Sequence, residues 1–261
     1  QGMATFGNLI GTGSAYEYTV KEIEAPNGYT ISPELLAGKK VTVNTSSNPP
    51  TTPIENEQIK VQFNKTDVNG KTIAGGLFSL FQNSGTSDEP NYTLLRTLTP
   101  TNQGVDLSGL GDGQYRIQEV VAPDGYQINQ TLIDFEVKQN DNNTRGVFVN
   151  GQQVTSGVLQ LKDYQGSALL RKTTEAGTNL AGAQFNVQRA DSNSDNYTDF
   201  GTQSEYVTNS DGQLKLDNLP PGKYKVKERT APTNYYLNSK EFDFVIDPIS
   251  ASDQAPATIQ L

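Results

Sequence analysis

Three segments of nearly the same sequence each end in a glutamate that could do chemistry inside a protein core. Each segment begins with a tyrosine and is followed by Ala-Pro and a tyrosine-bearing turn; the glutamates are Glu22, Glu119 and Glu228. In β-strands the side chains alternate with period two, so each glutamate falls on the same face as its tyrosine. An aromatic face is a core face, and a buried carboxylate is costly unless another group pairs with it. The sequence must therefore supply a partner.

Lysines on core faces supply that partner. In residues 61–65, Val61, Phe63 and Lys65 share one strand face, so an amine points toward the same interior as Glu119. In the next repeat Lys172 shares a strand face with the apolar residues Ala168 and Leu170 in the same way. Each amine is therefore expected to meet the glutamate of its own repeat.

A third reactive group follows at the end of the repeat. Residues 159–163 place Asp163 on a strand face with two leucines, and Asn56 stands at the equivalent position one repeat earlier. The interval from Asn56 to Asp163 equals the interval from Lys65 to Lys172, which supports this register. The same alignment puts the third counterpart two positions beyond Leu261, so we expect the last repeat to lack its acceptor.

An amine, a carboxyl group and an acceptor that meet in a dry core can react with one another. Burial favours uncharged forms, by up to about 3 to 5 pKa units when burial is complete. A protonated Glu119 could polarise the side-chain carbonyl of Asp163 and relay protons while the amine of Lys65 attacks it. The product is an intramolecular isopeptide bond, formed with loss of water from aspartate or of ammonia from asparagine. The alternative is a buried salt bridge, or strand ends that already reach solvent.

Composition excludes several other functions. The chain of 261 residues has no cysteine and no histidine, which removes disulfides and the commonest ligands of zinc sites and triads, and we expect no metal and no cofactor. The net charge of −9 argues against nucleic acid or an anionic membrane as a partner. No apolar run reaches transmembrane length, and no signal peptide opens the sequence.

Many short strands separated by Gly/Pro turns predict an all-β fold of tandem β-sandwiches. Residues 1–57 are expected to form the second half of a unit whose front half is missing. Residues 58–165 form a complete unit, and residues 166–261 form a unit without its final acceptor. A Pro/Ser/Thr-rich linker is predicted at 46–53 and a polar loop at 82–91.

The combination of a lysine strand, Tyr-x-x-x-Glu, Ala-Pro-x-Gly-Tyr and a last strand ending in Asn or Asp resembles a known family. It is similar to the collagen-adhesin B-type (Cna-B) domains of Gram-positive pilins and surface adhesins, over essentially the whole chain. The resemblance implies an inverse immunoglobulin-like sandwich and a Lys to Asn/Asp crosslink catalysed by the glutamate. It also implies display on a bacterial cell wall or pilus.

Carried over to this sequence, the resemblance implies one complete set, Lys65, Glu119 and Asp163. Asparagines at 140, 142 and 150 are rival acceptors if the last strand is misassigned. Two sets are incomplete: Lys172 with Glu228, whose acceptor would follow residue 261, and Glu22 with Asn56, whose lysine would precede residue 1. The third turn has Asn234 where the others have glycine, and asparagine tolerates the left-handed conformation.

A bond between the first and last strands would let tension bypass the residues between them, which suits a pilin subunit or an adhesin stalk. The expected partners are other pilin subunits or host surface ligands, and not a substrate, because the reaction turns over once. One alternative is a module that binds a host ligand, a carbohydrate or calcium through acidic loops at 141–144 or 191–199. Another is a set of accessory domains in a larger surface enzyme. Neither a sorting signal nor a pilin lysine motif was found, so shaft, tip and base stay open.

Overall fold

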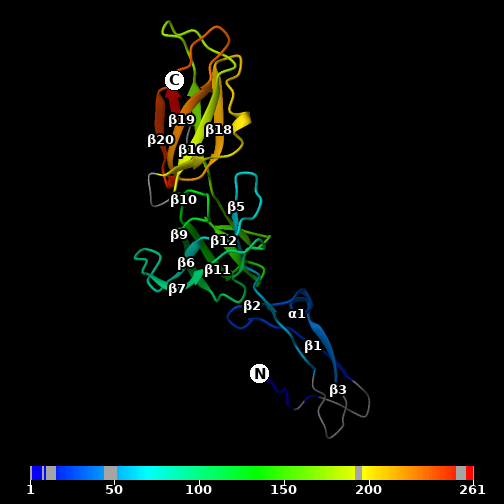
Figure 1. Cartoon of the computed structure of the whole chain (residues 1–261). Coiled ribbons are helices and arrows are strands. Elements are labelled where there is room, and N and C mark those ends of the chain that lie inside the picture. The colour runs from blue at the N-terminus through cyan, green and yellow to red at the C-terminus, as the bar shows by residue number, and fades with distance from the viewer. Residues whose placement is uncertain are drawn as a thin grey trace.

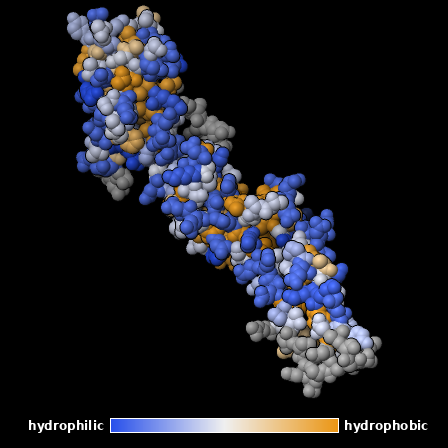
Figure 2. Space-filling model, turned by 90° about the vertical axis from the view of Figure 1, so that its right-hand side faces the viewer, coloured by the Kyte–Doolittle hydropathy of each residue, from blue (hydrophilic) through white to orange (hydrophobic). Residues whose placement is uncertain are grey.

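The computed structural model shows a chain folded almost entirely into β-strands that lie in successive groups along an extended molecule (Figure 1). The structure describes residues 2–7, 9, 16–43, 52–191, 196–250 and 257–260. Hydrophilic residues cover most of the face in Figure 2, and apolar residues show in patches among them. The all-β prediction is confirmed.

The first group contains two small antiparallel sheets. One pairs β1 (Tyr16–Val20) with β3 (Lys39–Val43), and the other pairs β2 (Tyr29–Thr30) with β4 (Glu57–Gln58). Ala25, Ile31 and Leu35 form a small core beside them. Most of the predicted linker, residues 46–51, lies outside the described residues.

A short helix, α1 (Pro33–Ala37), was not predicted. The sequence signals for this helix are the residues that cap its two ends. Ser32 caps the N-terminus by accepting a hydrogen bond from the Leu35 N–H at 3.4 Å, and Gly38 closes the C-terminus by donating to the Glu34 carbonyl. One turn of helix is too short to show a hydrophobic period of 3.6, so periodicity alone could not reveal it.

The middle group is a sandwich of two sheets around one core. The larger sheet has the order β13 (Gln152–Gln153), β12 (Arg145–Val149), β11 (Ile133–Gln139), β9 (Gly113–Val121), β6 (Leu77–Asn83) and β7 (Tyr92–Leu98). The smaller has the order β14 (Val158–Lys162), β5 (Gln62–Thr66) and β8 (Val105–Asp106). Because β6 runs to Asn83, the predicted polar loop begins two residues later than expected. Strand β12 directly follows the Asn/Asp-rich loop at residues 140–144, and the sequence did not predict it.

The third group repeats this plan. Its sheets have the orders β17 (Tyr197–Asp199), β16 (Gln184–Ala190), β19 (Gly222–Thr230), β20 (Glu241–Ile246), and β18 (Gln213–Leu219), β15 (Gly166–Arg171), β22 (Ala257–Gln260). A 3-10 turn, η1 (Gln203–Glu205), lies beside β16. As in the middle group, the first strand pairs in parallel with the last.

Strand parity places the side chains as the sequence predicted. Along β9, Tyr115, Ile117 and Glu119 are buried, whereas Arg116 and Gln118 are not. The apolar residues of this face pack between the two sheets. The glutamate is thus the last inward residue of a core strand.

The groups are joined by backbone pairing as well as by sequence. β10 (Ile128–Asn129), just after the second Ala-Pro turn, pairs in parallel with β21 (Ile249–Ser250) of the third group. The side chain of Gln127 is buried and donates to the Asp247 carbonyl at 2.6 Å. This cross-group pairing involves two residues on each side, too few for a periodic signal in the sequence.

The first and middle groups meet at Arg145. Its backbone N–H donates to Thr30 Oγ1 at 3.0 Å, and its guanidinium donates to the Ala25 carbonyl at 2.7 Å and pairs with Asp112. The residues after the first Ala-Pro turn therefore contact the next group, as those after the second turn do. Within the described residues, no helix is long and apolar enough to cross a bilayer.

Candidate functional site

Lys65, Glu119 and Asp163 meet in the core of the middle group. Lys65 Nζ contacts Asp163 Oδ1 and lies 3.2 Å from Glu119 Oε1, and all three side chains are shielded completely from solvent. Lys65 lies on β5, Glu119 lies on β9 in the opposite sheet, and Asp163 directly follows β14. The site thus joins both layers of the sandwich.

The parallel pairing of β5 with β14 brings amine and acceptor together. Lys65 is opposite Leu161 and Thr66 is opposite Lys162, and the Asp163 N–H then donates to the Thr66 carbonyl at 2.8 Å. Asp163 is therefore held against the C-terminal end of the lysine strand by a backbone hydrogen bond. A shift of one residue would turn its side chain to the other face.

Aromatic rings make the environment of the amine apolar. Lys65 Nζ lies 5.4 Å from the centroid of the Phe78 ring, and that ring packs edge-on against Phe63 at 5.1 Å. A cation over an aromatic face is attracted by its quadrupole, while the ring excludes water from the ammonium. The amine therefore has protein groups, and not solvent, as its neighbours.

Burial also changes the acids. It raises the pKa of Asp163 to about 7, against the opposing effect of the Lys65 charge. Burial likewise raises the pKa of Glu119, opposed first by Lys65 and then by the hydrogen bond from the Asn129 N–H. One cation with two carboxylates would leave a net negative charge in the core, so one shared proton makes the triad neutral. The predicted direction for the glutamate is confirmed.

The third group contains the same pair, without a third member among its described residues. Lys172 Nζ lies 3.2 Å from Glu228 Oε1, with 9% and 2% of the two side chains exposed. β22 runs parallel to β15 and brings Gln260 opposite Arg171, in the register that β14 has with β5. Among the described residues, no acceptor carboxyl or amide contacts Lys172.

The first group contains the other incomplete pair. The Asn56 side chain donates to Glu22 Oε2 at 2.6 Å and to the Thr30 carbonyl at 3.4 Å, and both Glu22 and Asn56 are half-buried. No lysine is paired with Glu22 in the described part of the chain. The structure thus brings Glu22 and Asn56 together as the alignment predicted.

The rival asparagines lie away from the amine. Asn140 folds its side chain back onto its own loop, where Oδ1 accepts from the N–H groups of Asn142 and Thr144, each at 3.0 Å. Asn142 and Asn150 are exposed in turns. Asp163 is the only candidate acceptor of the middle group that contacts Lys65.

One contact residue was missed in the sequence. The backbone N–H of Asn129 donates to Glu119 Oε2 at 2.6 Å, and Asn129 itself is buried. A signal was present, because an asparagine also follows Glu228 at the same interval, at Asn238. Its meaning depends on a backbone N–H, which no side-chain pattern reveals.

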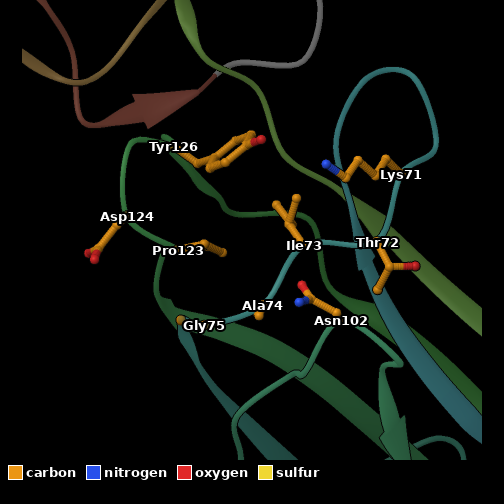
Figure 3. A pocket seen from close by; sticks show the side chains of 10 residues that line it. Lys71, Thr72, Ile73, Ala74, Gly75, Asn102, Pro123, Asp124 and Tyr126 are labelled. Atoms are coloured by element: carbon orange, nitrogen blue, oxygen red, sulfur yellow. The ribbon is translucent and has the colours of Figure 1, made fainter.

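A shallow cavity of about 380 Å³ lies beside the lysine strand, between residues 71–76 and the 123–126 turn (Figure 3). Ile73, which lines it, donates its N–H to the Lys65 carbonyl at 2.8 Å. In Figure 3 the Asp124 side chain points away from Ile73. Within the described residues, no group of three or more His, Cys, Asp or Glu side chains that could hold a metal ion was found, at this cavity or elsewhere.

Comparison with known proteins gives a family and several solved structures. The model of the SpaA family, described as a prealbumin-like fold domain, matches residues 59–152 and 166–256. No curated protein is significantly similar to the chain.

Three similar structures are the Bacillus anthracis TIE protein, a C-terminal fragment of the pilus adhesin SpaC from Lactobacillus rhamnosus GG, and BcpA, the major pilin subunit of Bacillus cereus. Their identities are 24%, 22% and 16%, and their TM-scores are 0.43, 0.40 and 0.28. The alignments cover 94%, 76% and 77% of this chain, and 41%, 86% and 98% of the other chains. This chain therefore spans less than half of the TIE protein. Likenesses this weak do not carry function from one chain to the other.

Proposed function

This chain belongs to the SpaA family of prealbumin-like fold domains, and from that membership we propose that it is part of a structural or adhesive protein of a Gram-positive surface, a pilin subunit or an adhesin stalk. Its partners are other pilin subunits or host surface ligands, and it lies in the cell wall or pilus. The family match is consistent with the resemblance to Cna-B-type domains.

We further propose that an isopeptide bond between Lys65 and Asp163 links the first and last strands of the middle group. Each group is called a unit from here on, and the middle unit comprises residues 58–165. The observation that carries this proposal is the contact of Lys65 Nζ with Asp163 Oδ1 in a fully buried site that also contains Glu119. An amine and a carboxyl group held in contact are already close together, and such proximity can contribute about 7 to 11 kcal/mol to lowering a barrier once the nitrogen is aligned with the carboxyl carbon.

The reaction balances with the residues present. The neutral amine of Lys65 attacks Cγ of Asp163, a C–N bond forms, and a C–O bond breaks to release one water. Glu119 takes a proton from the attacking nitrogen and delivers one to the departing oxygen, so it ends the reaction in its starting state. The acyl group and the amine belong to the same chain, so the protein reacts once and is not an enzyme.

The bond suits a load-bearing role. It joins the end of β5 to the residue after β14. These two strands are neighbours in the smaller sheet, and they come first and last among its strands along the chain. By analogy with a disulfide that closes a loop of about a hundred residues, it would contribute about 4 to 5 kcal/mol through the unfolded state. Under tension, the chain between the two residues would carry no load.

Mass spectrometry of the intact protein tests this proposal. The purified chain is expected to be lighter than its sequence by one water, and Lys65→Ala or Glu119→Ala should restore the full mass of the substituted sequence. Lys172→Ala is the matched control, because it removes the equivalent amine of the third unit and should leave the loss of one water intact. An unshifted mass for the unsubstituted protein would contradict the bond, and a loss of ammonia that Lys65→Ala abolishes would place the acceptor at an asparagine.

A further inference from the structure

Asn129 holds both the glutamate and the acceptor strand. Its backbone N–H donates to Glu119 Oε2 at 2.6 Å, and its side-chain Nδ2 donates to the Lys162 carbonyl, also at 2.6 Å. Its Oδ1 accepts the Thr131 N–H at 2.9 Å, which closes a local turn. Only 7% of Asn129 is exposed, so its backbone contact and its two side-chain contacts are all shielded from solvent.

We infer that Asn129 is a positioning residue that aligns Glu119 with Asp163 for formation of the isopeptide bond. The inference rests on the proposed function, because it assigns a role within that reaction. Lys162 immediately precedes Asp163, so a hydrogen bond to the Lys162 carbonyl fixes the backbone that presents the acceptor. One residue thus ties the proton carrier in one sheet to the acceptor strand in the other.

The geometry shows how this alignment works. The Glu119 carboxyl group has two oxygens. Oε2 accepts the hydrogen bond from the Asn129 N–H, and Oε1 lies 3.2 Å from Lys65 Nζ. With Oε2 held by a fixed N–H, the carboxyl plane cannot rotate freely, and Oε1 stays directed at the amine. Misplacement of a reacting group by about 1 Å can cost about a hundredfold in rate.

The third unit repeats this arrangement. The Asn238 N–H donates to Glu228 Oε2 at 2.7 Å, and Asn238 Oδ1 accepts the Lys240 N–H at 3.1 Å. Two units that share a Lys–Glu pair therefore hold the glutamate with the same asparagine turn. This recurrence associates the turn with the reactive pair.

The first unit lacks this turn. The position equivalent to Asn129 is Ser32, whose side chain caps α1, and Glu22 is held instead by the side chain of Asn56. In the described residues no lysine is paired with Glu22. The asparagine turn thus holds the glutamate in the two units whose described residues include an amine–carboxylate pair.

Two substitutions separate the contacts of Asn129. In Asn129→Ala the side chain loses both the acceptor for Thr131 and the donor for Lys162. In Asn129→Ser a hydroxyl can still accept the Thr131 N–H and preserve the turn, but it is too short to reach the Lys162 carbonyl. Asn238→Ala is the matched control, since it removes the equivalent side chain from the third unit.

The experiment follows the loss of one water over time in the full chain, by intact mass, from immediately after purification. We expect complete loss in the unsubstituted protein and in Asn238→Ala. Both Asn129 variants should contain unlinked chains that convert at least tenfold more slowly, with Asn129→Ala the slower. Conversion of both variants as fast as the control would overturn the inference. An unshifted unsubstituted protein would instead refute the bond itself.

The pH dependence distinguishes positioning from general stabilisation. The hydrogen bond from the Asn129 N–H lowers the pKa of Glu119. If the turn is lost in Asn129→Ala, Glu119 should stay protonated to a higher pH, and the pH at which the conversion rate falls should rise with it. Asn129→Ser keeps the turn, so its conversion rate should fall at a lower pH than that of Asn129→Ala. Circular dichroism must show that each variant is folded at each pH. Slower conversion of folded Asn129→Ala, with a rate that falls at the same pH as in Asn129→Ser, would mean that Asn129 supports only the fold, and would overturn the inference.

Discussion

Lys172 lies 3.2 Å from Glu228, the same separation that Lys65 has from Glu119. Two units of different sequence thus build the same buried amine–carboxylate pair on the first strand and the glutamate strand. The two units differ in the acceptor, because only Lys65 also contacts an acceptor side chain among the described residues. The pair alone is a buried salt bridge, and the acceptor makes a covalent product chemically accessible.

Replacement of the acceptor by asparagine gives a sharp mass prediction. Asp163→Asn has an unlinked mass different from that of the unsubstituted chain, but loss of ammonia from asparagine and of water from aspartate lead to the same amide. We therefore expect the two mature proteins to have identical intact masses. Asp163→Ala should retain the full mass of its sequence. A mature Asp163→Asn protein whose mass equals its own sequence would show that the amide does not react at this site.

The raised pKa of Asp163 predicts how stability changes with pH when the bond is absent. Glu119→Gln should prevent bond formation with little change in shape, leaving Asp163 buried beside Lys65. Burial, the largest cause of the raised pKa of Asp163, remains in this variant, although the raising effect of the Glu119 charge is lost, so the folded state still binds a proton more tightly than the unfolded state. This contribution to stability is full below the ordinary aspartate pKa of about 4 and is lost as pH rises through the raised pKa of the folded state.

Chemical denaturation of Glu119→Gln at several pH values measures this effect. We expect the free energy of unfolding to fall as pH rises from about 4 through the raised pKa of Asp163, by about 1.4 kcal/mol for each unit by which that pKa is raised, and then to level off. Glu119→Gln/Asp163→Asn is the control, because its neutral amide cannot titrate. Equal pH slopes in the two proteins would show that Asp163 does not titrate with a raised pKa.

The left-handed position of the three Ala-Pro turns was predictable from sequence. Gly28, Gly125 and Asn234 have φ of +83°, +85° and +71°, and in each turn the tyrosine N–H bonds back to the proline carbonyl. The prediction that Asn234 tolerates this conformation is confirmed. The glycines are not equivalent, because a Cβ on Gly28 would lie 2.7 Å from the Gly109 carbonyl oxygen, whereas one on Gly125 would meet nothing closer than 3.6 Å.

Substitutions at these turns should therefore rank in a fixed order. Gly125→Ala should reduce the free energy of unfolding by about 1 kcal/mol, the cost of a left-handed alanine. Gly28→Ala should cost more, because the backbone of the middle unit must also shift. Asn234→Gly should change stability by less than about 0.5 kcal/mol. Denaturant titration of each variant measures these values, and an equal cost at Gly28 and Gly125 would contradict the role of the close contact.

Sequence reasoning succeeded where a side-chain period carried the information and failed where the backbone did. Alternation along a strand was enough to aim Lys65, Glu119 and Asp163 at one interior point. It could not reveal the role of Asn129, which depends partly on a main-chain N–H. Nor could it predict the pairing of β10 with β21, which spans two residues of each strand and joins separate units.

The mechanical prediction follows from the positions of the two bonded residues. Force entering through β5 reaches Lys65, would cross the bond to Asp163, and would leave toward β15 without loading the chain between them. In single-molecule pulling from the two ends, the middle unit should therefore release almost no chain. The third unit, whose Lys172 contacts no acceptor among the described residues, should lengthen by about 3.3 to 3.6 Å for each residue that unfolds.

Glu119→Gln supplies the comparison for that measurement. Without the bond, β5 and β14 can separate, and the whole segment between Lys65 and Asp163 becomes extensible. A second, similar lengthening event should then appear beside that of the third unit. Glu228→Gln should change the force at which the third unit unfolds but add no new event, because Lys172 contacts no acceptor among the described residues. A full-length extension of the middle unit in the unsubstituted chain would mean that the load is carried by hydrogen bonds and packing alone.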